Sequence, residues 1–339
     1  MTPEDESFDN NLTENLIENR LVGTGLIPAA PLGFKSGFVG IVGRPNVGKS
    51  TLMNQLVGQK IAITSPIAQT TRNRLRGILT TPTAQLIFVD TPGIHKPQHQ
   101  LGEVLVKNAQ IAMHSVDLLL FVVDGSVEVG KGDRFIAELA KHCPIPVILG
   151  INKTDQQSTN LSINNQQSSN AEAIVASYNQ LAAEYGWAIA LFSAVTGDGI
   201  ETLLEQLIQR LELGPYYYPP DLVTDQPERF IMGELIREQV LRLTREEVPH
   251  STAIAIDRVD EEPTLTRVLA TIHVERPSQK GILIGKGGSM LKEIGTAARQ
   301  QIQKMIAGKV YLELFVKVQP KWRYSRTDLA DLGYKIENS

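Results

Sequence analysis

The sequence predicts an α/β domain with a mostly parallel sheet and helices on both faces, followed by an α+β domain. Two features of the 339-residue chain predict this order. Short β-branched apolar runs alternate with helical stretches between residues 36 and 213, a pattern typical of strands that crossover helices bury on both faces. From residue 228 the expected order becomes helix, strand, strand, helix, helix, strand. A chain of this length suits about two domains.

The composition is that of an ordinary globular protein and excludes several classes. Hydrophobic residues make up 42% and charged residues 21%, with a formal net charge of −4. The single cysteine, Cys143, excludes a disulfide framework and a Cys-rich zinc site, and it fits a reducing compartment. The longest dense apolar run, 118–123, has the length of a strand, whereas a membrane span needs ~20 residues. The acidic N-terminus does not resemble a secretory signal.

Residues 1–35 are expected to form a mostly disordered acidic tail. Residues 1–34 carry six acidic side chains and one basic side chain, Arg20, which gives a charge of −5. The segment has little periodicity and too few apolar residues to bury a core.

Five strands are expected in the first domain, which runs from 36 to 213. Their apolar runs are 38–42, 86–89, 118–123, 147–151 and 189–192. The stretch 156–170 interrupts the pattern, because thirteen of its fifteen residues are Gln, Asn, Ser or Thr. Since it cannot bury a core, we expect a flexible surface insert there. The Pro- and Tyr-rich segment 214–227 is expected to be a semi-rigid linker.

The second domain, 228–339, is expected to begin with a helix at 228–243 and strands at 251–259 and 265–275. A short helix, a glycine turn, a helix at 289–306 and a strand at 310–318 come next. Apolar residues at spacings of three and four give the helix after the turn one apolar face. They are Leu291, Ile294, Ala298, Ile302 and Met305.

A phosphate-binding loop follows the first expected strand. The eight residues after 38–42 match G-x-x-x-x-G-K-[ST] and lead into a helix, which is the context that this motif requires. They are Gly43, Arg44, Pro45, Asn46, Val47, Gly48, Lys49 and Ser50, with Thr51 next in the helix. Gly43 and Gly48 let the backbone wrap phosphates, which exposed N–H groups attract. Lys49 is expected to reach the β- and γ-phosphates and Ser50 to bind Mg²⁺.

A second phosphate motif, DTPG, ends the strand at 86–89. It consists of Asp90, Thr91, Pro92 and Gly93. A carboxylate at the tip of such a sheet is placed to hold Mg²⁺ through water, and the Gly93 N–H can meet the γ-phosphate.

Two motifs at the ends of later strands favour guanine. The first is NKTD, made of Asn152, Lys153, Thr154 and Asp155. The Asp155 carboxylate suits the two N–H donors of a guanine edge, and adenine lacks these donors. Ser193 and Ala194 end the last strand, where their backbone N–H groups would meet the guanine oxygen.

Together these motifs resemble those of translation-factor-class GTPases, and most closely the Era branch. The resemblance rests on GRPNVGKST, the segment 70–72, DTPG, NKTD and the pair at 193–194. In that class the loop around 65–73 is the first switch, and its threonine closes onto Mg²⁺ when the γ-phosphate is present. The resemblance assigns this role to Thr71, with Thr70 as the adjacent candidate. The second switch runs from DTPG to about residue 100, and loss of the γ-phosphate would release both switches.

The resemblance also implies roles at the reacting phosphate. The implied catalytic residues are Lys49, Thr71, Asp90 and Gly93, and the implied metal ligands are Ser50, Thr71 and, through water, Asp90. Ras-like GTPases place a water-orienting glutamine just after this glycine, and here that nucleotide-site position is Ile94. Because a hydrophobic side chain cannot orient a water, intrinsic hydrolysis is expected to be slow or to use another group.

A monovalent cation is one such group. In related GTPases a P-loop asparagine, here Asn46, helps to hold a cation that acts like an arginine finger. The resemblance therefore implies K⁺ as a further cofactor beside GTP, GDP and Mg²⁺. His95 is expected to be a switch-surface residue rather than a catalytic one.

The second domain has the charge and the loop of a nucleic-acid-binding module. Between 276 and 326 there are eleven basic and two acidic residues, a local charge of +9 in a chain of −4. At its centre lie an apolar turn, a G-x-x-G loop and a helix, the signature of a KH domain, which clamps about four nucleotides. With the order of elements given above, it resembles a type II KH domain. The expected RNA contacts are Ile282, Ile284, Gly285, Lys286, Gly287, Gly288, Ser289, Lys292, Lys321 and Arg323.

The Era resemblance covers 36–339, including a C-terminal LELFVKVQPKW similar to the close of the Era KH domain. It implies a GTP-binding and GTP-hydrolysing switch that binds the 3′ end of small-subunit (16S) rRNA and assists assembly of that subunit. It also implies a cytoplasmic protein with peripheral attachment to the inner (plasma) membrane, and we expect a monomer. The sequence contains no amphipathic membrane helix that would indicate this attachment independently.

Three alternatives stay open at this point. A P-loop ATPase is disfavoured by NKTD. A tandem-domain GTPase for large-subunit assembly needs two P-loops, and this chain has one. A regulatory adaptor that binds RNA or a membrane with negligible GTP turnover is kept open by Ile94.

Overall fold

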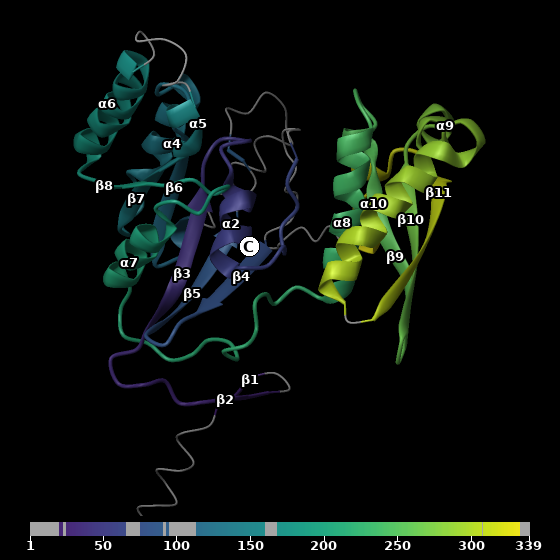
Figure 1. The fold of residues 1–339 in the computed structure, drawn as a ribbon, viewed down its shortest axis with the longest axis horizontal. Helices are drawn as coiled ribbons and strands as arrows, with labels where there is room; N and C mark the ends of the chain where they lie inside the picture. Colours follow the sequence, from purple (N-terminus) through teal and green to yellow (C-terminus); the bar gives the residue numbers. More distant parts are fainter. Residues whose placement is uncertain are drawn as a thin grey trace, which may run out of the picture. The chain divides into compact units, whose positions relative to one another are not determined.

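The structure, a computed structural model, describes residues 20–22, 25–65, 75–90, 93–94, 113–159, 168–306 and 308–332. The chain divides into two compact units, whose elements are drawn in Figure 1. Unit 1 comprises Met1–Lys60 and Arg74–Asp225, and unit 2 comprises Ile61–Asn73 and Gln226–Ser339. Each unit has its own sheet and its own apolar core.

Unit 1 is built on a six-stranded sheet in the order β4-β5-β3-β6-β7-β8. The strands are β3 (Lys35–Val42), β4 (Leu75–Thr80), β5 (Ala84–Asp90), β6 (Leu118–Asp124), β7 (Val147–Asn152) and β8 (Ala188–Leu191). All neighbouring pairs are parallel except β4 with β5. Every residue of β5 and β7 is buried, which explains why their apolar runs do not alternate with polar residues.

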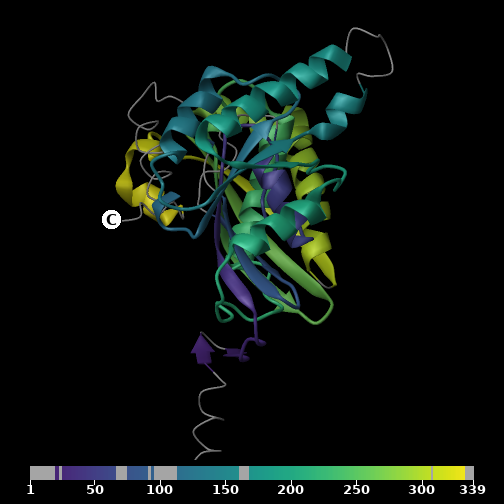
Figure 2. The same ribbon diagram turned by 90° about the vertical axis from the view of Figure 1, so that its left-hand side faces the viewer.

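Helices cover both faces of this sheet (Figures 1 and 2). α4 (Lys131–Ala140) and α6 (Ser168–Tyr185) share a core with one face. α2 (Lys49–Val57) and α7 (Ile200–Arg210) lie over the other face and bury their leucines. The carboxyl ends of the parallel strands therefore meet at one edge, which is where ligands bind in sheets of this kind.

The five expected strands of unit 1 all form, and β4 is an addition to them. Its sequence, LRGILT, mixes buried and half-buried positions at the edge of the sheet. Such a short mixed run is not distinguishable from a loop by its pattern alone. The polar stretch 156–170, expected to be a flexible insert, is helical at both ends, since α5 (Thr154–Thr159) enters it and α6 begins within it. Residues 160–167 lie outside the described residues.

The expectation of a disordered tail over 1–35 is wrong for residues 20–22 and 25–35. β1 (Arg20–Val22) and β2 (Gly25–Ile27) pair as an antiparallel hairpin. Ile27 and Phe34 are buried, and the Phe34 ring centroid lies 4.4 Å from that of Tyr216. The apolar residues late in the segment are therefore buried by packing, which the acidic composition of the whole segment did not predict. Residues 1–19 lie outside the described residues.

The segment 214–227, expected to be a linker, is instead packed along unit 1 for most of its length. The Gln85 side chain accepts the N–H of Tyr217 at 2.8 Å. The Arg76 guanidinium donates to Asp225 at 2.7 Å. Unit 1 therefore extends to Asp225, and the tyrosine-rich segment is attached to its surface by specific bonds.

Unit 2 has a three-stranded sheet in the order β11-β10-β9. β10 (Leu265–Val274) is parallel to β11 (Lys309–Val318) and antiparallel to β9 (Ala253–Glu262). The expected order of elements is confirmed, with helices α8 (Glu228–Leu243), α9 (Pro277–Ile284) and α10 (Ser289–Met305). Short turns of helix complete the unit: η2 (Pro249–Ser251), η3 (Lys286–Gly288), η4 (Trp322–Tyr324) and α11 (Arg326–Asp331).

The core of unit 2 lies between the sheet and helices α8 and α10. α8 is buried along most of its length, and the buried residues include three consecutive polar ones, Arg237, Glu238 and Gln239. Ile63 joins this core although it precedes β4 in sequence. Within the part of the chain that the structure describes, none of the helices combines the length and apolar character needed to span a bilayer.

Candidate functional site

The phosphate loop of unit 1 lies between β3 and α2, at the edge where the parallel strands end. A Cβ atom built on Gly43 would lie 2.3 Å from Val122 O, and one built on Gly48 would lie 2.3 Å from Asn152 Nδ2. Gly48 also has φ +98, in the region that favours glycine. Both motif glycines are therefore required by close approach of the loop to neighbouring groups.

Lys49 is buried beneath this loop. Its Nζ donates to Gly43 O at 3.0 Å and to Arg44 O at 2.9 Å. Burial lowers the pKa of Lys49 to about 8, although the nearby Asp90 carboxylate opposes the shift. A cation held in this way beside backbone N–H groups suits a polyphosphate.

Ser50 and Asp90 lie together as the sequence predicts. The Ser50 hydroxyl donates to Asp90 Oδ2 at 3.0 Å, and the Asp90 side chain is buried. A hydroxyl and a single carboxylate are hard oxygen donors, and Mg²⁺ binds with few protein ligands beside water and phosphate oxygens. The residues present therefore fit Mg²⁺. Among the described residues no group of three or more His, Cys, Asp or Glu side chains forms a separate metal site.

Asn152 joins the phosphate loop to the guanine motifs. Its Nδ2 donates to Val47 O at 2.8 Å, across 105 residues of sequence. Its Oδ1 accepts the N–H groups of Lys153 at 2.8 Å and Ala194 at 2.9 Å. One buried amide thus connects the phosphate loop after β3 with the chain segments that follow β7 and β8.

The guanine loop is braced by two further contacts. The Ser193 hydroxyl donates to Asp155 Oδ1 at 2.7 Å. Lys153 has φ +68 and its Nζ binds Asp124 Oδ2 at 2.5 Å. Burial raises the pKa of Asp124, but hydrogen bonds from Lys153 and Ser126 outweigh it and lower that pKa. In this structure the Ser193 N–H donates to Asp198 O and the Ala194 N–H to Asn152, so the expected contact with the guanine oxygen stays a prediction.

Arg44 and Ile94 are both held by contacts with neighbouring elements of unit 1. The Arg44 Nε donates to Asp133 Oδ1 of α4 at 2.7 Å, and the Asp133 side chain is fully buried. Ile94 is 2% exposed and packs in the core beside Val42 and Met113. Ile94 therefore anchors the chain after DTPG by packing, which agrees with its inability to orient a water.

Close packing holds Gly93 against the phosphate loop. A Cβ atom on Gly93 would lie 2.8 Å from Pro45 N, and the next residue's N–H donates to Gly43 O at 3.1 Å. Thr71, Thr91, Pro92 and His95 lie outside the described residues, so their expected roles stay predictions.

Several residues of this site have no motif to identify them. Asp124 and Asp133 each fix a motif side chain from another strand or helix. A cavity of about 530 Å³ lies beside Ala194 and is also lined by Gln55, Lys60 and Val195. Sequence separation hides these partners, since each lies on an element far along the chain from the motif it supports.

The G-x-x-G loop of unit 2 joins α9 to α10. Gly285, Gly287 and Gly288 have φ values of +70, +60 and +82. A Cβ atom on Gly285 would lie 2.8 Å from Met290 Cβ, whereas none of the atoms near Gly287 or Gly288 would come within 4 Å of one. The loop is therefore open on its outer side, where a nucleic-acid backbone can approach closely.

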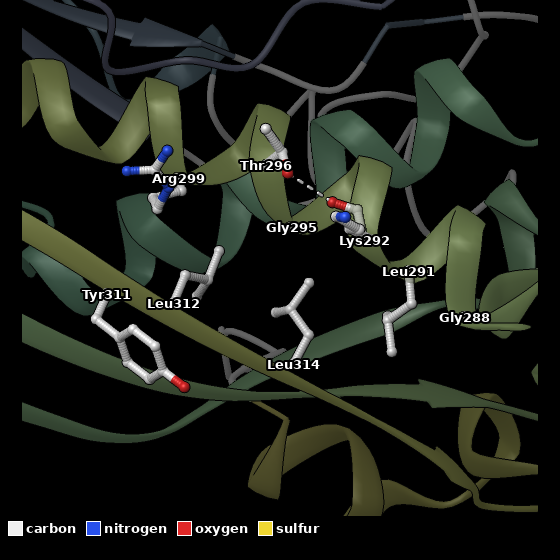
Figure 3. A pocket seen from close by; sticks show the side chains of 9 residues that line it. All are labelled: Gly288, Leu291, Lys292, Gly295, Thr296, Arg299, Tyr311, Leu312 and Leu314. Atoms are coloured by element: carbon white, nitrogen blue, oxygen red, sulfur yellow. Dashed lines mark hydrogen bonds between the residues drawn. The ribbon is translucent and has the colours of Figure 1, made fainter.

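A groove of about 450 Å³ runs from this loop between α10 and β11. Figure 3 shows Lys292 and Arg299 of α10 above Leu312 and Leu314 of β11, with Tyr311 at one end. Arg299, Tyr311 and Leu314 were not among the expected RNA contacts. Arg299 lies about three turns along the helix that follows the loop, whereas Tyr311 and Leu314 lie on β11 and line the groove only because the chain folds back beside α10.

The other expected RNA contacts lie in different settings. Ile282 is 51% exposed on α9, and Lys286, Ser289 and Lys292 are exposed. Lys321 is exposed with φ +58, ahead of the buried Trp322. The Arg323 guanidinium binds Glu275 and donates to His250 O at 3.4 Å. Arg323 therefore has a structural role at the end of β10, and its expected RNA contact is not tested by this arrangement.

Comparisons with known proteins agree with the nucleotide motifs of unit 1 and with the G-x-x-G domain of unit 2. Residues 38–153 match a family described as 50S ribosome-binding GTPase, and residues 247–323 match the KH domain family. The chain is 71% identical to GTPase Era of Nostoc sp. over 331 residues, which is 98% of this chain and 97% of the relative.

Two solved structures are similar along the chain. One is Era in complex with MgGDPNP and nucleotides 1506–1542 of 16S ribosomal RNA, with a TM-score of 0.81 and 37% identity. The other is a variant of Aquifex aeolicus Era bound to GDP and AlF₄⁻, with a TM-score of 0.81 and 36% identity. Each comparison covers 89% of this chain and 100% of the other chain.

Asn152→Ala is expected to weaken all guanine nucleotides together. The change removes the donor to Val47 O and leaves the buried Ala194 N–H and the partly buried Lys153 N–H without their acceptor. At about 1–3 kcal/mol for a buried polar group left unsatisfied, GDP affinity should fall at least about tenfold. Titration with a fluorescent GDP measures the loss. Asp155→Asn serves as the comparison, because it should weaken the preference for guanine without loosening the phosphate loop. Equal GDP affinity for Asn152→Ala and the wild type would contradict this role.

Asp133→Asn is expected to loosen the phosphate loop through Arg44. The isosteric change weakens a charge-assisted bond to a partly exposed guanidinium, which is worth roughly 1 kcal/mol more than a neutral one. GDP dissociation should then accelerate about fivefold, which stopped-flow displacement measures. Glu138→Gln, an exposed charge on the same helix, is the control. If both variants release GDP at the wild-type rate, the ion pair has no influence on the loop.

Proposed function

Because the chain belongs to the Era family of GTPases, we propose that it is a GTP-driven switch that binds the 3′ end of small-subunit rRNA. Membership follows from the high identity to GTPase Era along nearly the whole chain. The protein is accordingly a GTPase that uses GTP, GDP and Mg²⁺. Specific residues of unit 1 bind and hydrolyse the nucleotide, and this activity is coupled to RNA binding by unit 2.

At the nucleotide, the chain's own groups bind, orient and hold charge. The backbone of the phosphate loop and Lys49 hold the β- and γ-phosphates, and the Gly93 N–H meets the γ-phosphate. When bound, Mg²⁺ neutralises charge that develops between these phosphates. Ser50 would ligate it directly, Thr71 would ligate it in the GTP form, and Asp90 would act through water. Asp155 selects guanine. Asn152 holds the loop that carries Asp155 against the phosphate loop.

The observation that carries the RNA half of the proposal is the geometry of the G-x-x-G loop. Its three glycines have positive φ values, and its outer side is free of close neighbours at Gly287 and Gly288. The loop opens onto a groove with an apolar floor and basic residues Lys292 and Arg299. An apolar floor accepts bases and basic side chains neutralise phosphates, so single-stranded RNA suits this groove.

The small subunit is favoured as the source of this RNA. A relative that is similar along most of this chain has been solved with a 16S rRNA fragment. The family description that names the 50S subunit matches only residues 38–153, which exclude the G-x-x-G loop. Because unit 2 carries the RNA groove, it decides the partner, and binding of the 3′ end serves maturation of the small subunit. The adaptor alternative with negligible turnover is disfavoured by membership of a GTPase family.

The partner also determines the proposed location. A protein that matures ribosomal subunits works in the cytoplasm, and we expect it to act as a monomer there. Peripheral attachment to the inner face of the plasma membrane follows from the family resemblance alone. Sedimentation of the purified protein with liposomes, in the presence of GTP analogue or GDP, tests that attachment.

Lys286→Asp combined with Gly287→Asp is expected to abolish RNA binding and to leave GTP binding intact. The change places two carboxylates against the RNA phosphates, and a Cβ atom at Gly287 meets no neighbour within 4 Å. Filter binding of a labelled 3′-terminal 16S oligonucleotide should show a loss of at least about a hundredfold. Arg258→Asp, an exposed charge reversal on β9, is the matched control. Retained RNA affinity in the double variant would remove the loop from the interface, and a joint loss of GTP binding would refute the division of labour between the units.

GTP hydrolysis is expected to be faster in K⁺ than in Na⁺. With Ile94 buried in the core, the chain lacks a water-orienting glutamine at that position, and a cation beside Asn46 could stabilise the transferred charge instead. Asn46 is exposed with φ +65. Phosphate release measured in matched K⁺ and Na⁺ buffers tests this, and Asn46→Ala should remove the difference. Equal rates in both buffers for the wild type would rule out the cation.

A further inference from the structure

A short segment of the chain leaves unit 1 by sequence and packs into unit 2. α2 belongs to unit 1 and ends at Val57, whereas unit 2 begins at Ile61. Ile61, Ala62 and Ile63 are 3%, 5% and 4% exposed. Ile63 lies in the same apolar core as α8 of unit 2. Residues 61–65 are therefore held by the RNA-binding unit, although they lead along the chain toward Thr71.

A buried carboxylate on α8 fixes this segment by its backbone. Glu238 Oε1 accepts the N–H of Thr64 at 3.0 Å and the Thr64 hydroxyl at 3.3 Å. Arg242 donates to the same carboxylate oxygen at 3.2 Å and to Thr64 O at 3.4 Å. Gln239 donates to Glu238 Oε2 at 3.2 Å. The N–H and the carbonyl of Thr64 are thus both bonded to side chains of one helix.

Burying a carboxylate here is costly unless its partners stay in place. The Glu238 side chain is fully buried beside an apolar core that an aliphatic residue could extend. Replacing buried ionic groups by apolar ones is often neutral or stabilising, so such groups are weak contributors to stability itself. The carboxylate instead supplies a directional bond to a peptide N–H, which depends on the position of that peptide.

The position of the Thr64 peptide matters because the chain leads from it to the expected Mg²⁺ ligand. Thr71 is seven residues after Thr64, a length that spans at most about 25 Å when fully extended. If Thr71 ligates Mg²⁺ in the GTP form and not in the GDP form, its required distance from the fixed Thr64 peptide differs between the two forms. A ligand can shift an equilibrium only through contacts that differ between its states, and the anchor at Thr64 lies on the chain that carries the expected Mg²⁺ ligand.

We propose that Glu238 is a positioning residue that couples nucleotide state to RNA binding by holding Thr64 on unit 2. The inference rests on the proposed function, and specifies the contact that links its two halves. It requires that the bonds at Thr64 differ in strength between the GTP and GDP forms. By linkage, RNA then changes nucleotide affinity by the same factor as nucleotide changes RNA affinity.

The test uses the full-length protein and Glu238→Gln. The Kd for the 3′-terminal 16S oligonucleotide is measured with a non-hydrolysable GTP analogue and with GDP, and the ratio of the two is compared. Glu238→Gln replaces a charge-assisted hydrogen bond by a neutral one. The difference between the RNA Kd values in the two nucleotide states should therefore shrink by a factor of about five. The ratio of analogue and GDP affinities, measured with and without RNA, should move by the same factor. A purely structural role of Glu238 would lower the melting temperature and leave both ratios unchanged.

Two further variants keep the test decisive. Glu228→Gln removes an equal charge from an exposed position of α8, and both ratios should stay at wild-type values. Thr64→Val deletes the hydroxyl that donates to Glu238 and accepts from Arg242 but keeps the Thr64 N–H bond to Glu238, so it should shift both ratios in the same direction by less, even if Glu238→Gln fails to fold. Unchanged ratios in the folded variants would overturn the inference. A wild type that binds RNA equally in both nucleotide states overturns it while leaving RNA binding standing, and a wild type that binds no RNA refutes the proposed function as well.

Discussion

The amide of Asn152 is the contact on which the nucleotide site depends. Its donor holds the phosphate loop through Val47 O, and its acceptor holds the guanine loop and the residue after β8. Neither a carboxylate nor an aliphatic side chain offers a donor and an acceptor in this geometry. Gly48 is compelled by the same contact, since any Cβ there would collide with the Asn152 amide. Motifs separated by about a hundred residues thus form one rigid binding surface.

Two ion pairs further hold the guanine loop and the phosphate loop in place. Asp124 holds Lys153, and Asp133 of α4 holds Arg44 of the phosphate loop. Each acid is largely buried, so each pair is directional and lies away from solvent screening. The apolar side of the loop is held differently, by Ile94 in the core and by Gly93 against Pro45. Ion pairs and apolar packing therefore both hold the same loop.

The backbone passes between the two units more than once. The chain passes between them at 60/61, 73/74 and 225/226, and the first two passages bound the segment that precedes β4. This segment contributes Ile63 to the core of unit 2 and Thr64 to the buried carboxylate of α8. From this segment the covalent chain runs on toward Thr71, the expected Mg²⁺ ligand, while α8 packs against the sheet of unit 2. Three consecutive buried polar residues on α8 are otherwise an unusual choice for a core helix.

Local sequence alone specifies much of the chemistry of this protein: the glycine-rich phosphate loop, NKTD, the G-x-x-G loop and the strands whose apolar runs are continuous. These features depend on neighbours a few residues away, because hydrophobic period and backbone freedom are local properties. The edge strand β4, the hairpin in the acidic tail and the attachment of the tyrosine-rich segment arise only when the chain folds. So do the partnerships of Asp133 with Arg44 and of Glu238 with Thr64. Each joins residues far apart in the chain, and no local pattern records which distant group will satisfy a buried charge or an open edge.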